Sequence, residues 1–123
     1  MIDWDRVARL LDDDGEFRVA ARHWTAVVRL DVGDQSRALR IEDGRVRSLA
    51  PSARAAACDV FVSAPAEVWG RLLEPIPPPF YHDLFAATVH HGVQMNPDYL
   101  DFAAYYPALR RMLEVLREAR AAR

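Results

Sequence analysis

Hydrophobic and polar positions alternate through much of the first half of the chain. Between positions 23 and 32 every second residue is apolar, and a Gly33-Asp34 turn leads into a second alternating run over 36–42. A period of two with one polar face predicts antiparallel strands that have one wet side. The run 16–22 alternates in the same way, so we expect a strand there as well.

Three further strands follow from the same reasoning. Asp43-Gly44 is a strong hairpin signal and leads into a strand over 45–49. Residues 58–62 form a short apolar run that predicts another strand, and 88–95 form the last candidate. The proline-rich segment 75–79 can be neither helix nor central strand, so it is expected to be a stiff connector.

Between and after these predicted strands, apolar residues recur with helical spacing. Residues 3–13 predict a helix capped by Asp3. Ser63 is expected to end the preceding strand and to cap a second helix, whose apolar stripe contains Trp69. Residues 80–87 predict a short helix.

The C-terminal segment has the strongest periodicity in the chain. Asn96 and Pro97 suit the start of a helix, and its apolar residues then recur at intervals of three and four. Pro107 lies inside this helix and removes one backbone donor, which predicts a kink. We expect the part after Pro107 to act as a lid over a cavity. The stripe consists of Tyr99, Phe102, Tyr106, Leu109, Leu113 and Leu116.

Length and charge limit the class of protein. A chain of 123 residues with 51% apolar residues predicts one folded domain, spanning 1–123. The net charge is −2 and basic residues are spread along the chain, which argues against a nucleic-acid partner. No apolar run reaches the length of a membrane span. The start lacks the features of a signal peptide, and the single cysteine fits a reducing cytoplasm. The use of arginine without lysine, together with abundant alanine, suggests a bacterial origin.

The residues that most often perform catalysis lack suitable partners. Cys58 starts a strand and has no histidine near it in sequence, so we interpret it as a packing residue. His90 and His91 are adjacent and would point to opposite faces of a strand, which disfavours a metal site with His82. No phosphate loop or dinucleotide motif is present. We therefore predict no catalytic residue, no metal and no cofactor.

Aromatic and thioether side chains are concentrated in the second half of the chain. Any single one is most simply a core residue, but as a group they could line a cavity for an apolar ligand. The candidate ligand-binding residues are Trp69, Phe80, Phe85, Met95, Phe102, Tyr106 and Leu113.

The order of these elements resembles the sterol carrier protein-2-like family of sterol-transfer domains. The segments that carry the resemblance are RALRIEDGRVRSL, CDVFVSAPAEVWGRLLE, VHHGVQMNPDYLDF and ALRRMLEVLRE. The resemblance implies an α+β fold with a mostly antiparallel sheet of about five strands. It also implies helices that cover one face of the sheet and enclose an apolar cavity. The expected function is non-enzymatic binding or transfer of a fatty acyl chain, sterol or similar lipid.

Two other functions remain open at the level of sequence. The chain could be a small subunit or interaction module that partners a lipid-metabolising enzyme, or it could form a homodimer. The proline run and the tyrosines Tyr81, Tyr99 and Tyr105 favour this interpretation, because tyrosine and arginine are enriched at interfaces. A small hydrolase or metal enzyme that uses His82, Asp83, His90 or His91 ranks last.

Overall fold

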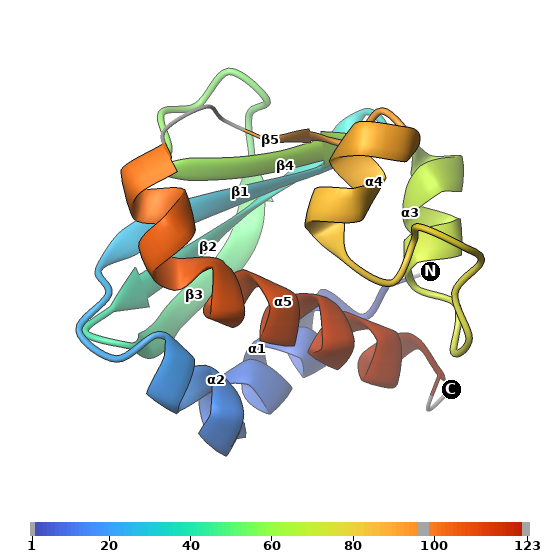
Figure 1. Ribbon diagram of the computed structural model, residues 1–123. Coiled ribbons are helices and arrows are strands. Elements are labelled where there is room, and N and C mark those ends of the chain that lie inside the picture. The colour runs from blue at the N-terminus through green and yellow to red at the C-terminus, as the bar shows by residue number, and fades with distance from the viewer. Residues whose placement is uncertain (1, 96–98, 122–123) are drawn as a thin grey trace.

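The protein is an α+β domain in which helices cover one face of a five-stranded sheet (Figure 1). The computed structural model describes residues 2–95 and 99–121, with side chains for 2–95 and 104–120. None of the described helices is both long and apolar enough to cross a membrane. In chain order the elements are α1 (Trp4–Asp13), α2 (Gly15–Ala20), β1 (Ala26–Val32), β2 (Gln35–Glu42), β3 (Arg45–Ser52), β4 (Val60–Ala64), α3 (Ala66–Leu72), α4 (Leu84–His90), β5 (Gln94–Met95) and α5 (Tyr99–Ala121).

The sheet has the strand order β3-β2-β1-β4-β5. Neighbouring strands are antiparallel except β1 and β4, which run parallel with Val28 opposite Val60. This confirms a mostly antiparallel sheet. The two hairpins lie where the Gly33-Asp34 and Asp43-Gly44 signals predict them, and Asp43, Gly33 and Gly44 all have positive φ.

The prediction of a strand over 16–22 is wrong, because this segment forms α2. The Asp14 carboxylate accepts a hydrogen bond from the Phe17 N–H at 2.8 Å and so starts a new helix. Phe17 and Ala21 lie four residues apart and are both buried, whereas Val19 is 68% exposed. The apolar positions therefore satisfy a helical period as well as an alternating one.

The core lies between the inner face of the sheet and the helices. Helix α5 crosses below the sheet and contacts both α1 and α2 (Figure 1). Its predicted kink is confirmed, because Tyr105 has non-helical angles (φ −117°, ψ 15°) two residues before Pro107. After Pro107 the helix packs into the core, since Leu109, Leu113 and Leu116 are at most 1% exposed, and the expectation that this part acts as a lid stays a prediction.

Several boundaries differ from the sequence prediction, and two of these differences concern β4 and β5. Ser63 lies inside β4 and is buried, so it does not cap α3; Pro65 stands at that position and offers no side-chain hydrogen bond. Only Gln94 and Met95 of the predicted strand 88–95 are strand, because α4 continues to His90. The predicted start of the last helix at 96–98 lies outside the described residues.

Residues 53–59, between β3 and β4, cover part of the outer face of the sheet (Figure 1). Arg29 on β1 donates to the Ala56 carbonyl at 3.0 Å, and Arg54 donates to the Ser63 hydroxyl at 3.0 Å. Beneath this loop Asp31 is only 1% exposed and is paired with Arg29, with Nε–Oδ1 at 3.0 Å. The outer face of the sheet, which was predicted to be solvent-exposed, is therefore partly covered and holds a buried ion pair.

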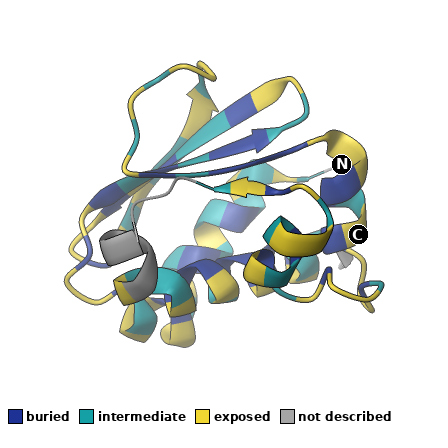
Figure 2. Cartoon of the chain, turned by 45° about the horizontal axis from the view of Figure 1, so that its top comes forward, coloured by how far each residue is buried: buried dark blue, intermediate teal, exposed yellow. Residues whose placement is uncertain are grey.

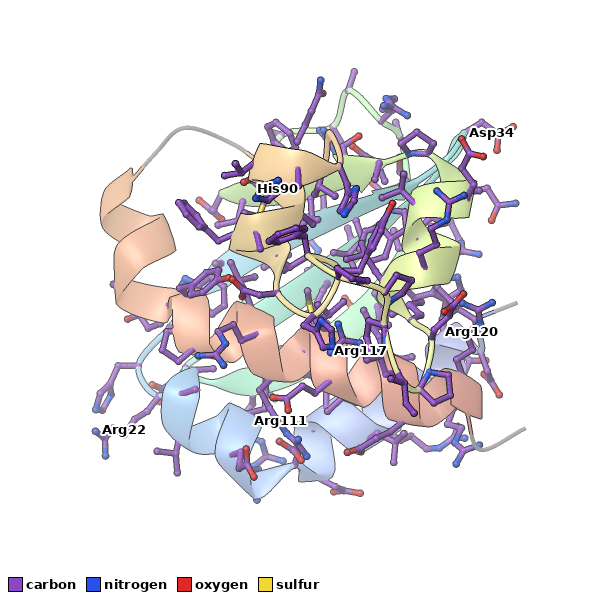
Figure 3. All side chains as sticks on the ribbon, turned by 45° about the vertical axis from the view of Figure 1, so that its right-hand side comes forward. Arg22, Asp34, His90, Arg111, Arg117 and Arg120 are labelled. Carbon is purple, nitrogen blue, oxygen red and sulfur yellow. The ribbon has the colours of Figure 1, made fainter. Side chains whose placement is uncertain are left out.

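An ion pair also joins the two N-terminal helices to α5. Arg111 binds both carboxylate oxygens of Asp14, at 2.7 and 2.9 Å, and Figure 3 shows it between α5 and these helices. The hydrogen bonds from Arg111 lower the pKa of Asp14, and the bond from the Phe17 N–H acts in the same direction against the effect of burial.

This pair should make the fold sensitive to acid. A carboxylate whose pKa is lower in the folded state stabilises the fold above its unfolded pKa of about 4, and this stabilisation is lost as the pH falls through the folded-state value. We expect Asp14→Asn to cost roughly 1–3 kcal/mol at pH 7, because Asn still caps α2 but loses the charged pair. In acid denaturation profiles the deficit should begin to shrink near pH 4 and disappear below the lowered folded-state pKa of Asp14.

The exposed neighbour Asp13 provides the control. Asp13→Asn should change the free energy of unfolding by less than about 0.5 kcal/mol at pH 7. An Asp14→Asn deficit that is the same at pH 7 and at pH 2 would show that the carboxylate charge does not contribute.

Candidate functional site

Helix α4 exposes two large apolar side chains on one side of the molecule. Phe85 is 54% exposed and Val89 is 66% exposed, and they lie four residues apart on the same face of the helix. The opposite side of α4 is anchored, because Leu84 and Ala87 are fully buried. Figure 2 shows exposed stretches along α4 and the connector before it. A pair of exposed apolar side chains on an anchored helix is a candidate contact site.

Tyr106 joins α4 to the kinked part of α5. Its hydroxyl accepts a hydrogen bond from the Phe85 N–H at 3.0 Å and donates one to the Asp83 carboxylate. Burial raises the pKa of Tyr106, and the bond to Asp83 raises it further. The phenol therefore stays neutral, and its two hydrogen bonds hold the N-terminus of α4 to α5. Arg110 lies 3.9 Å from Asp83 and partly balances its charge.

Met95 brings the edge of the sheet to the same region. It pairs with Val62 in the β4–β5 ladder, and directly opposed residues of an antiparallel pair point to the same face. Val62 is fully buried on the inner face, so Met95 also faces the helices, and it remains partly exposed. We refer to Phe85, Val89, Met95 and Tyr106 together as the α4 rim. In Figure 1, α4 lies beside β4 and β5 at the right of the view, and the first part of α5 lies at the left.

The α4 rim contains three of the seven candidate residues named from the sequence. Two others belong to the core, since Trp69 and Leu113 are each 1% exposed. Phe80 is 51% exposed and stacks on His90 with ring centroids 3.8 Å apart, so it borders α4 from the connector. Phe102 lies among the residues whose side chains are not described. Val89 was missed because a single valine gives no signal in sequence; only its place one turn after Phe85 marks it.

Trp69 also lines an open pocket of about 370 Å³ beside α3. Its indole N–H donates to the Asp31 carbonyl at 2.8 Å, so only the ring can contribute to the pocket. The other lining residues are Ile2, Trp4, Val32, Asp34, Gln35, Ala66, Gly70, Leu73 and Arg120.

The surroundings of Cys58 and His91 do not favour catalysis. Burial raises the pKa of the Cys58 thiol, which disfavours the nucleophilic thiolate. His91 stacks on Tyr81 at 3.6 Å, and its Nε2 lies 3.0 Å from the Pro79 carbonyl oxygen. Within the described side chains, no three of His, Cys, Asp and Glu gather as a metal site would require.

Comparison with solved structures identifies the fold. A crystal structure of sterol carrier protein 2 superimposes with a TM-score of 0.78 at 21% identity, covering 97% of each chain. A conserved hypothetical protein from Thermus thermophilus, described as a possible sterol carrier protein, gives a TM-score of 0.71 at 21% identity, covering 93% of this chain and 83% of that one. A UbiJ-SCP2 ubiquinone synthesis protein gives 0.57 at 19% identity, covering 90% and 87%.

These similarities confirm the resemblance drawn from the sequence at the level of the fold. The chain has the sterol carrier protein 2 fold, with a mostly antiparallel five-stranded sheet and helices on one face. No protein-family model and no curated protein sequence matches it significantly.

Proposed function

We propose that the protein binds an apolar small molecule at the α4 rim, and that it carries this molecule without chemical change. The observation that carries the proposal is the exposure of Phe85 and Val89 on a helix whose other side is fixed in the core. Removing apolar surface from water lowers the free energy by about 25 cal/mol per Å². A ligand that covers both side chains would gain that free energy.

The surroundings of the rim suit an apolar ligand. Tyr106 and Asp83 bind each other, so their polar atoms are partly satisfied within the protein. Met95 offers a flexible side chain that can adapt to differing shapes. The names of the structural neighbours point to sterol carriage and ubiquinone synthesis, and both concern largely apolar molecules. A fatty acyl chain, a sterol or a similar lipid is therefore the ligand class that we propose.

Two serine substitutions test the rim. We expect the double variant Phe85→Ser and Val89→Ser to bind a fluorescent sterol and a fluorescent fatty acid roughly tenfold more weakly than the parent, because about 1–2 kcal/mol of apolar contact is lost. Its melting temperature should change little, since both side chains are largely exposed. Fluorescence titration and thermal unfolding give the two quantities.

Val19 provides a matched control, because it is 68% exposed on α2, away from the rim. Val19→Ser removes the same surface as Val89→Ser and should leave both affinities unchanged. Equal weakening by Val19→Ser and by the rim variant, or no saturable binding by the parent, would contradict the proposal.

A second candidate function is contact with a protein partner through the connector. Ile76 is 85% exposed within the stiff proline-rich segment 75–79, a combination that favours a preformed contact site. Of the three tyrosines that the sequence offers for this role, Tyr81 is buried, Tyr105 stacks on Trp24, and the side chain of Tyr99 lies outside the described residues. Sedimentation of the protein with proteins purified from its host tests this reading. A stoichiometric complex that Ile76→Ser abolishes would support it, and a monomer in every mixture would contradict it.

A further inference from the structure

The pocket of about 370 Å³ beside α3 is separate from the α4 rim and shares no residue with it. Trp69 of α3 and Leu73, which directly follows α3, line it, and both are 1% exposed. Ile2 and Trp4 of the N-terminal segment and Val32 at the end of β1 form apolar walls. A volume of this size lies within the range of small-molecule sites.

Gly70 leaves space in this pocket that another residue would fill. It lies inside α3, where glycine is the least favourable residue apart from proline. A Cβ atom at this position would meet nothing within 4 Å, and its φ is not positive. Neither backbone conformation nor close packing therefore requires glycine here. Glycine is instead expected where a ligand approaches the backbone closely.

Arg120 supplies a cation at the edge of the same pocket. Its Nη1 donates to the Gly70 carbonyl at 2.8 Å, which fixes the guanidinium beside α3. Its other nitrogen atoms make no hydrogen bond within the described part of the chain. A planar guanidinium with free donors is suited to a carboxylate.

The one acidic residue of the lining stands apart from this cation. Asp34 lies on the exposed β1–β2 turn, and Figure 3 shows it and Arg120 at opposite ends of α3. A carboxylate bound beside Arg120 would therefore avoid the Asp34 charge, while an apolar body could lie over Gly70 between the two.

We propose that this pocket is a second binding site, which takes a small carboxylic acid with an apolar body. The apolar part would lie against Trp4 and the backbone of Gly70, and the carboxylate would bind Arg120. This inference does not depend on the function proposed for the α4 rim, because the two sites use different residues and different elements.

Decanoic acid is a suitable probe, with 1-decanol as its uncharged counterpart. In a ¹H–¹⁵N NMR titration we expect saturable shifts at the Trp4 indole and the Gly70 amide. Arg120→Met should weaken decanoate binding about tenfold and leave decanol binding unchanged, because a hydrogen-bonded charge pair is lost. Arg120→Lys should retain part of the affinity.

Gly70→Leu tests the space itself. We expect it to fill the pocket and abolish these shifts without lowering the melting temperature, since leucine is a better helix former than glycine. Gly15→Leu is the matched control, because Gly15 also lies in a helix, with nothing within 4 Å of its Cβ position. That variant should bind decanoate as the parent does.

Three results would overturn the second site. The first is decanoate binding by Gly70→Leu with parental affinity, and the second is equal affinity of the parent for decanoate and decanol. The third is a set of shifts confined to α4 and β5, which would place the acid at the α4 rim and leave the function proposed there intact.

Discussion

Replacing Trp69 by alanine is expected to lower the free energy of unfolding by roughly 3–5 kcal/mol, the usual cost of removing a buried large aromatic side chain. Trp69 is 1% exposed and is among the largest fully buried side chains in the described core. Its indole N–H also holds α3 to β1 through the Asp31 carbonyl. Chemical denaturation monitored by far-UV circular dichroism gives the value.

Trp69→Phe separates packing from hydrogen bonding. It keeps most of the apolar volume and loses the indole N–H, so it should cost only about 1–3 kcal/mol. Equal losses for the two variants would show that the hydrogen bond dominates. A loss below about 1 kcal/mol for Trp69→Ala would show that this side chain is not part of the stabilising core.

Asp31→Ala is expected to destabilise the fold by roughly 3–5 kcal/mol, because it leaves the Arg29 guanidinium without its counter-charge. Arg29 is 13% exposed and binds both oxygens of Asp31. The Ser36 hydroxyl, which donates to Asp31 at 2.6 Å, would lose its acceptor as well. Denaturant unfolding at pH 7 measures the loss.

The double variant Arg29→Met and Asp31→Ala tests the cause. Removing both charges eliminates the unpaired guanidinium, so the double variant should be more stable than Asp31→Ala alone. It should still be less stable than the parent, because Arg29 also binds the Ala56 carbonyl and lies over the Phe61 ring. If instead the two single losses simply add, the charge pair is not the source of the effect.

The sequence predicts most of this fold because its local signals agree with its tertiary contacts. Both turns with glycine at positive φ are found where expected, and Asp3 caps α1 by accepting from the Arg6 N–H. Pro107 also marks the kink of α5 to within two residues. At each of these sites the local chemistry alone decides the backbone conformation.

Tertiary contacts decide the parts that sequence reasoning missed. Phe17, Val19 and Ala21 fit a strand period, but burial of Phe17 and Ala21 against the core selects a helix. Ser63 has the chemistry of a helix cap, yet it lies in β4, where it pairs with β1 and β5 and its hydroxyl accepts from Arg54. The cap at Asp14 is a local signal for α2 that the alternation of apolar residues obscured, whereas the place of Ser63 has no local signal.

The candidate site was only partly predictable for the same reason. Aromatic density in the second half of the chain indicated an apolar site and included Phe85 and Tyr106, which the structure joins through a hydrogen bond. The same density included Trp69 and Leu113, which are core residues. Hydrophobicity identifies the residues that avoid water, but only the fold decides which of them remain exposed for a ligand.

A crystal structure of the protein with a bound long-chain fatty acid tests the central claim most directly. We predict that the acyl chain contacts Phe85 and Val89 on α4 and reaches Met95 and Tyr106. An acyl chain bound elsewhere on the domain, with the α4 rim left uncovered at saturating ligand, would contradict the account.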